Sequence, residues 1–395
     1  MVVEQLPKPA SRQTGPGELF QMLRDGAPRT RAELASVTGQ ARSTVATRID
    51  MLMTAGLIVT VGEAHSTGGR PPAVFAFSPE SRVVLAVDLG ATHARMALTD
   101  LASNIIADSE DKLPIDLGPD TVLAWVCNKG DEMLAASGRG RRELVSVGVG
   151  LPGPVEFSSG RPINPPIMPG WDDADVAGRL GAHFDAPVLV DNDVNIMALG
   201  EHRSEWPDVS DLLFVKVATG IGSGIIADGS LRRGARGAAG DIGHIAVQGA
   251  DDIPCRCGNL GCLEAVAGSD AIARRLREEG IEVSGSAQIV ALVRSGDLNA
   301  ARALRQAGRD VGTVLAACVS MLNPSMIVIG GSIAEAGEQL MAGIREVVYS
   351  RSLPLATQHL RVVASRARGE AAILGASALA VDHVLSADAI DAALA

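Results

Sequence analysis

The stretch that decides the fold is VVLAVDLGATHARMALTDLASNIIAD, residues 83–108. Runs of aliphatic residues in it alternate with short turns, which predicts strand, turn, strand, turn, strand. A helical stretch at Thr121–Ala136 and a buried strand at Leu144–Val149 follow. The predicted strands of the stretch are Val83–Val87, Ala94–Thr99 and Ile105–Asp108.

A second set of strands begins at Pro187–Val190 and repeats this order of elements. It continues through Leu212–Val217 and Gly224–Ala227, a long helix near Ala301–Leu322, and a strand at Met326–Ile329. Two successive units of this kind predict two α/β lobes with a cleft between them.

The composition agrees with this class of fold. The 395 residues are 47% hydrophobic and only 3% aromatic, with 44 glycines, as in α/β proteins packed by aliphatic side chains. No apolar run approaches the ~20 residues that a membrane span needs. The first 17 residues have no apolar signal core, so we expect a cytoplasmic protein that does not enter a membrane.

Three turns that contain glycine follow strands. Asp88 can hold Mg²⁺ through water, while a turn at residues 219–224 and another at 330–332 can admit the phosphates and adenosine of a nucleotide. Each turn alone is a weak signal, because glycine occurs wherever strands reverse. The candidate nucleotide-binding residues are Asp88, Gly90, Thr92, Thr219, Gly220, Gly222, Gly330 and Gly331.

Three cysteines crowd into eight residues shortly after a histidine. His244, Cys255, Cys257 and Cys262 form a complete Cys₃His set of the kind that binds structural zinc. Three buried free cysteines are the alternative, but this spacing rarely arises by chance. We therefore predict one structural zinc ion at these residues.

The N-terminal part has a different pattern. Thr30 and Glu33 form a capping box that opens a helix, and Gly39 ends it. The next predicted helix, about Ala41–Ala55, buries one stripe and leaves a polar face for the major groove of DNA, and a strand that follows predicts a wing. The candidate DNA-binding residues on this face are Ser43, Thr44, Thr47 and Arg48.

Arg70, in Gly69-Arg70-Pro71, adds to the DNA interpretation. An arginine on a stiff, narrow backbone suits the minor groove, although the segment can also be a plain linker. The net charge of the chain is −11, but residues 1–80 carry eight Lys/Arg and seven Asp/Glu, so the acidity belongs to the remainder. An acidic protein of this kind can still bind double-stranded DNA through its N-terminal part.

Together with these segments, residues 150–155 (GLPGPV), 164–166 (NPP) and 190–195 (VDNDVN) make the sequence resemble the ROK family of repressors, open reading frames and sugar kinases. The resemblance runs from about Gly17 to Ala380 and is greatest to the helix-turn-helix regulators of that family. It implies an actin/hexokinase-like (ribonuclease H-like) pair of α/β lobes preceded by a winged helix-turn-helix.

The resemblance also implies roles for residues in the cleft. Asp193 would be the general base of a kinase, and His244 would bind zinc with one ring nitrogen and sugar with the other. From the residues alone, Asp191 and Asp193 can equally cap the helix that begins near Asn195. The sugar-binding residues that the resemblance implies are Gly153, Asn164, Asn192, Asp193, Asp241, His244 and Glu264.

Several residues depart from the pattern of the family's kinases. Ala91 and His93 replace a glycine and a lysine of the first loop, Ala218 replaces a glycine, and Asp241 replaces a glutamate. In a kinase, the methyl group of Ala91 would crowd a nucleotide phosphate at the first loop. Asp241 has a shorter side chain than glutamate, so its carboxylate would reach a sugar hydroxyl differently. We read the arginines at 139–142 and 232–236 as solvated loop charge.

We expect four parts: a flexible tail at 1–16, a winged helix-turn-helix at 17–80, a first lobe at 81–195 completed by a helix at 370–395, and a second lobe at 196–369. The function expected is a sugar-responsive DNA-binding regulator, a repressor that acts as a homodimer or dimer of dimers on an operator. The alternatives are an ATP-dependent sugar kinase that uses ATP and Mg²⁺, alone or combined with DNA binding, and a body that binds another protein.

Overall fold

The computed structural model describes residues 15–63 and 71–395. Two compact units divide the chain. The first, here called the head, comprises the described residues up to Val83, residues 100–104 and Val381–Ala395. The second, the body, comprises Val84–Thr99 and Ile105–Ala380.

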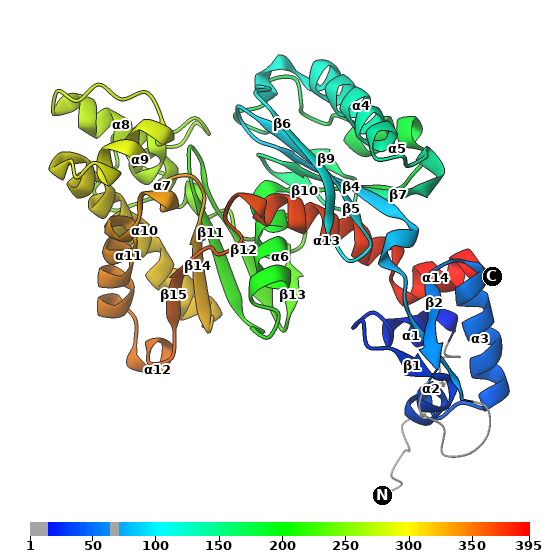
Figure 1. Cartoon of the computed structure of the whole chain (residues 1–395). Coiled ribbons are helices and arrows are strands. Elements are labelled where there is room, and N and C mark those ends of the chain that lie inside the picture. The colour runs from blue at the N-terminus through cyan, green and yellow to red at the C-terminus, as the bar shows by residue number, and fades with distance from the viewer. Residues whose placement is uncertain (1–14, 64–70) are drawn as a thin grey trace, which may run out of the picture. The chain divides into compact units, whose positions relative to one another are not determined.

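The head has the order of elements expected for a winged helix-turn-helix (Figure 1). The capping box of Thr30 and Glu33 opens its second helix as predicted, and Gly39 ends that helix with a positive φ of 68°. Three strands pair in the order β1-β3-β2. The elements are α1 (Pro16–Gln21), β1 (Arg29–Thr30), α2 (Arg31–Thr38), α3 (Arg42–Thr54), β2 (Ile58–Glu63), β3 (Ala73–Phe77) and α14 (Ala387–Leu394).

The C-terminal helix α14 belongs to the head and not to the first lobe. The Asp391 carboxylate accepts a hydrogen bond from the Gly17 amide (2.7 Å), and Gln21 donates to the Leu385 carbonyl (2.7 Å). An ion pair of 3.0 Å joins Arg24 to Asp382. The segment 370–395, expected to complete the first lobe, is therefore divided, because its last turns find polar partners on α1.

The body contains two five-stranded sheets with the same topology (Figure 1). The first has the order β10-β7-β4-β5-β6 and the second the order β13-β12-β11-β14-β15. In each sheet, three strands consecutive in the chain occupy one side, and two later strands extend the other side. The strands of the first sheet are β4 (Val83–Leu89), β5 (Ala94–Asp100), β6 (Ile105–Asp111), β7 (Leu144–Leu151) and β10 (Val188–Asn192). Those of the second sheet are β11 (Leu212–Val217), β12 (Ile221–Ala227), β13 (Ser230–Arg232), β14 (Met326–Gly330) and β15 (Arg361–Ala364).

This repeated topology confirms the predicted actin/hexokinase-like pair of lobes. Strands were expected at the positions of β4, β5, β6, β7, β10, β11, β12 and β14, and the structure has them there. The remaining elements are β8 (Val155–Glu156), β9 (Arg161–Pro162), α4 (Pro119–Ala136), α5 (Val176–Phe184), α6 (Asp193–Glu205), α7 (Leu263–Ala267), α8 (Ser269–Glu278), α9 (Ser286–Arg294), α10 (Leu298–Leu322), α11 (Glu338–Arg351), α12 (Pro354–Thr357) and α13 (Ala371–Val384).

Helix α6 joins the two lobes of the body. Ile196 and Leu199 pack into a cluster with residues of the first sheet, whereas Val194 and Ala198 pack with residues of the second. Because α6 contacts both sheets, the expected division between lobes at 195/196 falls inside a shared element. The first turn of α6 lies at the ends of β10 and β11, beside a cavity that is described below.

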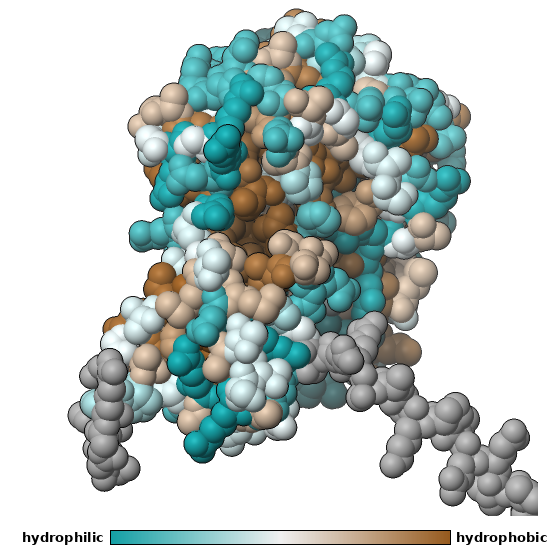
Figure 2. Space-filling view, turned by 90° about the vertical axis from the view of Figure 1, so that its right-hand side faces the viewer, coloured by the Kyte–Doolittle hydropathy of each residue, from teal (hydrophilic) through white to brown (hydrophobic). Residues whose placement is uncertain are grey.

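Apolar side chains gather inside the lobes. The face shown in Figure 2 is mixed, with hydrophilic residues around its upper rim and hydrophobic residues in its middle. Within the described ranges, no single helix is long and apolar enough to cross a membrane. Residues 368–384 and α14 meet that criterion only when counted together, as a pair bent by 49°.

Candidate functional site

Helix α3 carries the predicted DNA-binding face of the head. Val45, Ile49 and Leu52 are fully buried, as the apolar stripe predicts. On the other side Ser43, Thr44 and Thr47 are exposed, while Arg48 is half-buried and donates a hydrogen bond to Gln40 (2.5 Å). Arg70, the predicted minor-groove arginine, lies outside the residues that the structure describes.

The body contains a cavity of about 810 Å³ lined by elements of both lobes. The loop after β4, the start of α6, the β11–β12 turn and the end of β14 all reach it. The predicted residues that line it are Asp88, Gly90, Thr92, Gly153, Asn192, Asp193, Thr219, Gly220, Gly222, Asp241, His244, Glu264, Gly330 and Gly331. Residues as distant as 88 and 331 in the chain therefore share one cavity.

Asn164 is the predicted sugar-binding residue that the structure does not place among the lining residues of this cavity. It is exposed and adopts a positive φ of 43°, and its amide donates a hydrogen bond to Asp172 (2.8 Å). The turn after β9 holds Asn164 away from the lining, and its contact with a sugar stays a prediction. The neighbouring residues Pro166 and Ile167 line the cavity instead.

The start of α6 is organised by Asn192. Its side-chain oxygen accepts the amides of Val194 (2.9 Å) and Asn195 (3.3 Å), and its side-chain nitrogen donates to the Gly153 carbonyl (3.0 Å). Asn192 is therefore the helix cap, and the alternative in which Asp191 and Asp193 cap α6 is wrong. Because the cap is supplied by an amide, the carboxylate of Asp193 is left for the cavity.

Asp191 has a structural role that the sequence did not reveal. Its buried carboxylate pairs with Arg233 (2.6 Å) and accepts a hydrogen bond from Asn195 (2.8 Å). The Arg233 guanidinium also stacks on the Phe157 ring, 3.8 Å from the centroid. Arg233 thus anchors the loop after β13 to strand β10, and the interpretation of all the arginines at 232–236 as solvated charge is wrong.

The second glycine segment is only partly a turn. The turn consists of residues 218–220, and from Ile221 the chain is strand β12. A methyl group on Gly224 would lie 2.4 Å from Cβ of Ala198, and one on Gly222 would lie 3.0 Å from Val194. These glycines let helix α6 approach the second sheet closely, which explains them without a nucleotide.

In the first glycine loop, residues 88–93, the side chain of His93 folds back over Gly90. A Cβ on Gly90 would lie 2.2 Å from Cε1 of His93, so the imidazole covers that glycine. Nε2 of His93 lies 3.7 Å from the Asp88 carboxylate. The neighbouring Asp88 carboxylate raises the pKa of His93 in spite of the partial burial of the imidazole.

Lys216 is a charged residue of the cavity that sequence reasoning missed. Its ammonium group donates a hydrogen bond of 2.5 Å to Oδ2 of Asp193. The Asp193 side chain is 7% exposed and that of Lys216 is 23% exposed. A lysine within an apolar strand is the one available signal, because Lys216 interrupts the otherwise aliphatic and aromatic run of β11.

Glu264 lies in the first turn of α7, and its side chain contacts the end of the β11–β12 turn. Its carboxylate accepts the Ile221 amide at 3.2 Å. Burial raises the pKa of Glu264, and the hydrogen bond from Ile221 only partly opposes this effect. Asp241, which precedes a short 3₁₀ turn at 242–244, is exposed at the cavity.

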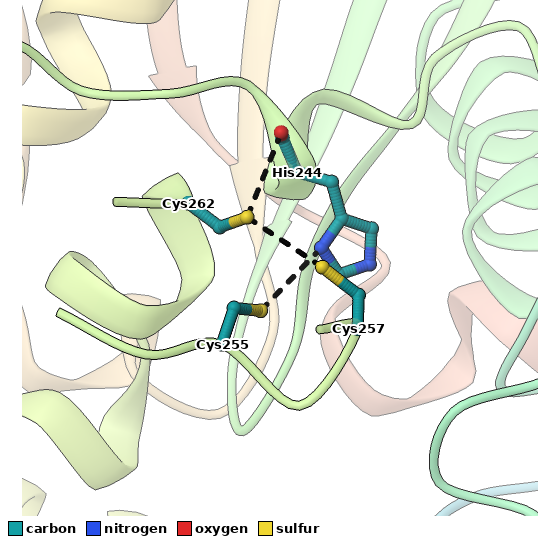
Figure 3. A group of neighbouring side chains, drawn as sticks. All are labelled: His244, Cys255, Cys257 and Cys262. Atoms are coloured by element: carbon teal, nitrogen blue, oxygen red, sulfur yellow. Dashed lines mark hydrogen bonds between the residues drawn. The ribbon is translucent and has the colours of Figure 1, made fainter. Parts of the chain in front are cut away.

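The four predicted metal ligands come together, with their ligand atoms within 4.8 Å of one another. Nδ1 of His244 lies 3.7 Å from Sγ of Cys255, and the sulfurs of Cys257 and Cys262 are 3.6 Å apart. Figure 3 shows this ring nitrogen on the side of the sulfurs, with the second ring nitrogen pointing away. The cluster can hold a metal ion.

The spacing and the chemistry of the cluster both fit such an ion. Tetrahedral ligands with metal–sulfur bonds of about 2.3 Å lie about 3.8 Å from one another, close to the distances in the protein. Burial, followed by hydrogen bonds in which the Cys262 thiol is the donor to Cys257 and Cys255, raises the pKa of Cys262 to about 12. Three thiols packed this closely need a bound cation to be ionised together at neutral pH.

Comparison with known proteins adds to this geometry. The model of the ROK family matches residues 84–383. The xylose repressor of Caldicellulosiruptor bescii is 28% identical over 371 residues, which are 90% of this chain and 92% of the repressor. A crystal structure of a ROK family transcriptional regulator, a homologue of the E. coli MLC protein, superposes with a TM-score of 0.83 and 26% identity over 96% of this chain and 98% of that one.

The ROK hexokinase from Thermus thermophilus superposes with a TM-score of 0.65 and 29% identity, covering 76% of this chain and 99% of the hexokinase. The hexokinase therefore matches a smaller share of this chain than the two regulators do. The family match spans most of the body and includes the cavity and the metal cluster. The chain belongs to the ROK family.

Proposed function

We propose that this protein is a sugar-responsive transcriptional repressor: the head binds an operator, and a sugar in the cavity of the body changes that binding. The observation that carries the proposal is the pairing of the two parts in one chain. The repressor and regulator relatives extend over both parts. The polar face of α3, with Ser43, Thr44 and Thr47 exposed, supports a contact with the major groove.

The cavity is suited to a neutral sugar. Asp193, Asp241 and Glu264 offer carboxylate acceptors for hydroxyl groups, and Asn192 holds a backbone loop beside them. Several acceptors that converge from different elements can read the orientation of hydroxyl groups. Asp193 is paired with Lys216, whereas Asp241 and Glu264 add negative charge to the same lining, which favours an uncharged ligand over an acidic one.

The metal cluster would support the sugar site and would do no chemistry of its own. His244, Cys255, Cys257 and Cys262 would bind zinc as a closed set. Because His244 also lines the cavity, such an ion would fix the orientation of its imidazole toward the sugar. We further propose that the protein acts as a homodimer or a dimer of dimers, since operators commonly offer two half-sites.

A sugar kinase is the second candidate function. The position of Asp193 in the cavity, beside the glycine turns at 88–92 and 219–220, favours it. In that case the protein would use ATP and Mg²⁺, with Asp193 as general base. Two features oppose it: the Asp193 carboxylate is engaged by Lys216, and the His93 ring covers the glycine of the first loop.

One experiment distinguishes the repressor from the kinase. Operator binding and ATP turnover are measured on the same preparation of the whole chain. Fluorescence anisotropy with DNA from upstream of the gene is read with and without each of glucose, xylose and N-acetylglucosamine. We expect one of the sugars to change DNA affinity with no sugar-dependent ATP consumption. Turnover at or above ~1 s⁻¹ with any of them would instead establish a working kinase.

Asp193→Asn sharpens this comparison. In a sensor the substitution weakens the response to sugar, because the amide accepts a hydroxyl hydrogen less well than a carboxylate does. Asp131→Asn is the control, since Asp131 pairs with Arg141 and is absent from the lining of the cavity. An unchanged sugar response in Asp193→Asn would contradict the proposed site.

A further inference from the structure

Two carboxylates of the cavity each have a basic side chain of the same chain beside them. Asp193 receives the ammonium of Lys216 at 2.5 Å, and Asp88 lies 3.7 Å from Nε2 of His93. These two carboxylates are the ones that phosphoryl transfer would need, as the base and the metal-binding group.

Lys216 donates its hydrogen bond to Asp193 and shares the cavity with two further carboxylates, Asp88 and Glu264. Burial lowers its pKa, but the charge and hydrogen bond of Asp193, with the charges of Asp88 and Glu264, outweigh burial and raise it. The ammonium is therefore charged at neutral pH. It projects from the end of the central strand β11 into the same cavity that Asp88 lines.

The choice of lysine at this position is informative. The chain has 31 arginines and only four lysines, so its positive charge is supplied almost entirely by arginine. A guanidinium is a broad planar fork, whereas an ammonium is a compact point charge with three donors. A compact charge among carboxylate oxygens is what a small divalent cation provides.

We propose that Lys216 is a built-in cation that stands in for a divalent metal ion at Asp193 and Asp88, and that it positions Asp193 to accept a sugar hydroxyl. Lys216 is a positioning residue, because it acts through Asp193. The assignment of a sugar to this cavity rests on the proposed function, but the replacement of a metal ion by Lys216 does not. One consequence is that sugar binding by the natural protein does not depend on Mg²⁺.

Three variants isolate the ammonium group. Lys216→Met removes the charge and keeps the stem, whereas Lys216→Arg keeps a charge. Lys129→Met is the matched control, because Lys129 also pairs with carboxylates, Asp111 at 3.8 Å and Glu132 at 3.1 Å, and its side chain is 25% exposed. Lys129 is absent from the lining of the cavity.

The first measurement is Mn²⁺ binding by electron paramagnetic resonance, with no sugar present. Lys216→Met is expected to bind one additional Mn²⁺ per chain compared with the natural protein, Lys216→Arg and Lys129→Met. Adding Asp88→Asn to Lys216→Met should remove that site. No additional Mn²⁺ in a folded Lys216→Met would overturn the proposal, and so would Mn²⁺ bound at Asp88 in the natural protein.

The second measurement is calorimetry with the sugar that changes operator binding. Lys216→Met should weaken sugar binding at least about tenfold, as expected for the loss of a charge-assisted contact, and Mg²⁺ should restore it. Lys216→Arg should retain most of the affinity without Mg²⁺. If Lys216→Met gains the Mn²⁺ site and no tested sugar binds any variant, the sugar proposal fails and the metal-replacement proposal stands. If sugar binds equally well to every variant, the positioning role of Lys216 is overturned.

Discussion

Gly375→Ala tests the closest helix contact of the body. A Cβ at Gly375 of α13 would lie 1.7 Å from the carbonyl oxygen of Ile196 in α6, and one at Gly200 of α6 would lie 2.0 Å from the carbonyl oxygen of Ala371. The two helices therefore touch backbone to backbone. Neither backbone can rotate away as a side chain can, so the helices must separate.

The magnitude follows from two opposed effects. Alanine favours a helix over glycine by about 0.5–1 kcal/mol. Overpacking a well-filled contact costs about 1–3 kcal/mol, and a backbone contact this short belongs at the upper end. The net loss is about 2 kcal/mol. With an unfolding entropy of about 2.1 cal/mol/K per residue over roughly 300 residues, Tm falls by about 3 °C.

Thermal melting of the purified variant, followed by circular dichroism, measures this shift. Gly369→Ala is the control, because a Cβ at Gly369 meets nothing within 4 Å and its Tm should stay close to that of the natural protein. A Tm of Gly375→Ala equal to or above the natural value would refute the reasoning. That result would mean that the helices relax freely at this crossing.

Three further predictions concern other parts of the chain. Cys257→Ser should lose the bound zinc and much of the sugar affinity, whereas Cys127→Ser keeps both; elemental analysis that finds no zinc in natural protein purified without chelator would contradict this. His93→Gln should lower Tm at pH 5.5 more than at pH 9, because the raised pKa of His93 means that its stabilisation is present below its ordinary value of 6.5 and is lost as pH rises through the folded value. An equal loss of Tm at both pH values would exclude that ion pair. Arg70→Ala should weaken operator binding by about 1–3 kcal/mol and leave sugar affinity unchanged, which titrations at matched salt can check.

The elements of the fold were predictable where the signal is local. The apolar runs of β4 and β11, the capping box at Thr30 and the cysteine spacing each lie within a short window. The metal cluster was likewise predictable, because three of its ligands fall within eight residues. Nothing in these windows depends on the packing of distant segments.

The contacts that were missed join distant segments. Lys216 and Asp193 are 23 residues apart, and Asp191 and Arg233 are 42 apart, so no periodicity connects them. The glycines of β12 looked like a nucleotide loop, because sequence does not distinguish a glycine needed for a turn from one that admits a neighbouring helix. Asn164 lies outside the lining of the pocket, because asparagine tolerates a positive φ but its presence in a sequence does not show that the loop adopts one.

The membership of α14 in the head has a consequence for synthesis of the protein. On the ribosome the N-terminal helices emerge first, whereas Asp391 and Leu385, the partner of Gln21, are made only after the body. The head therefore stays incomplete until the whole body has been translated. A chain released early would lack the contacts that close α1, so a truncated product would be a poor competitor for the operator.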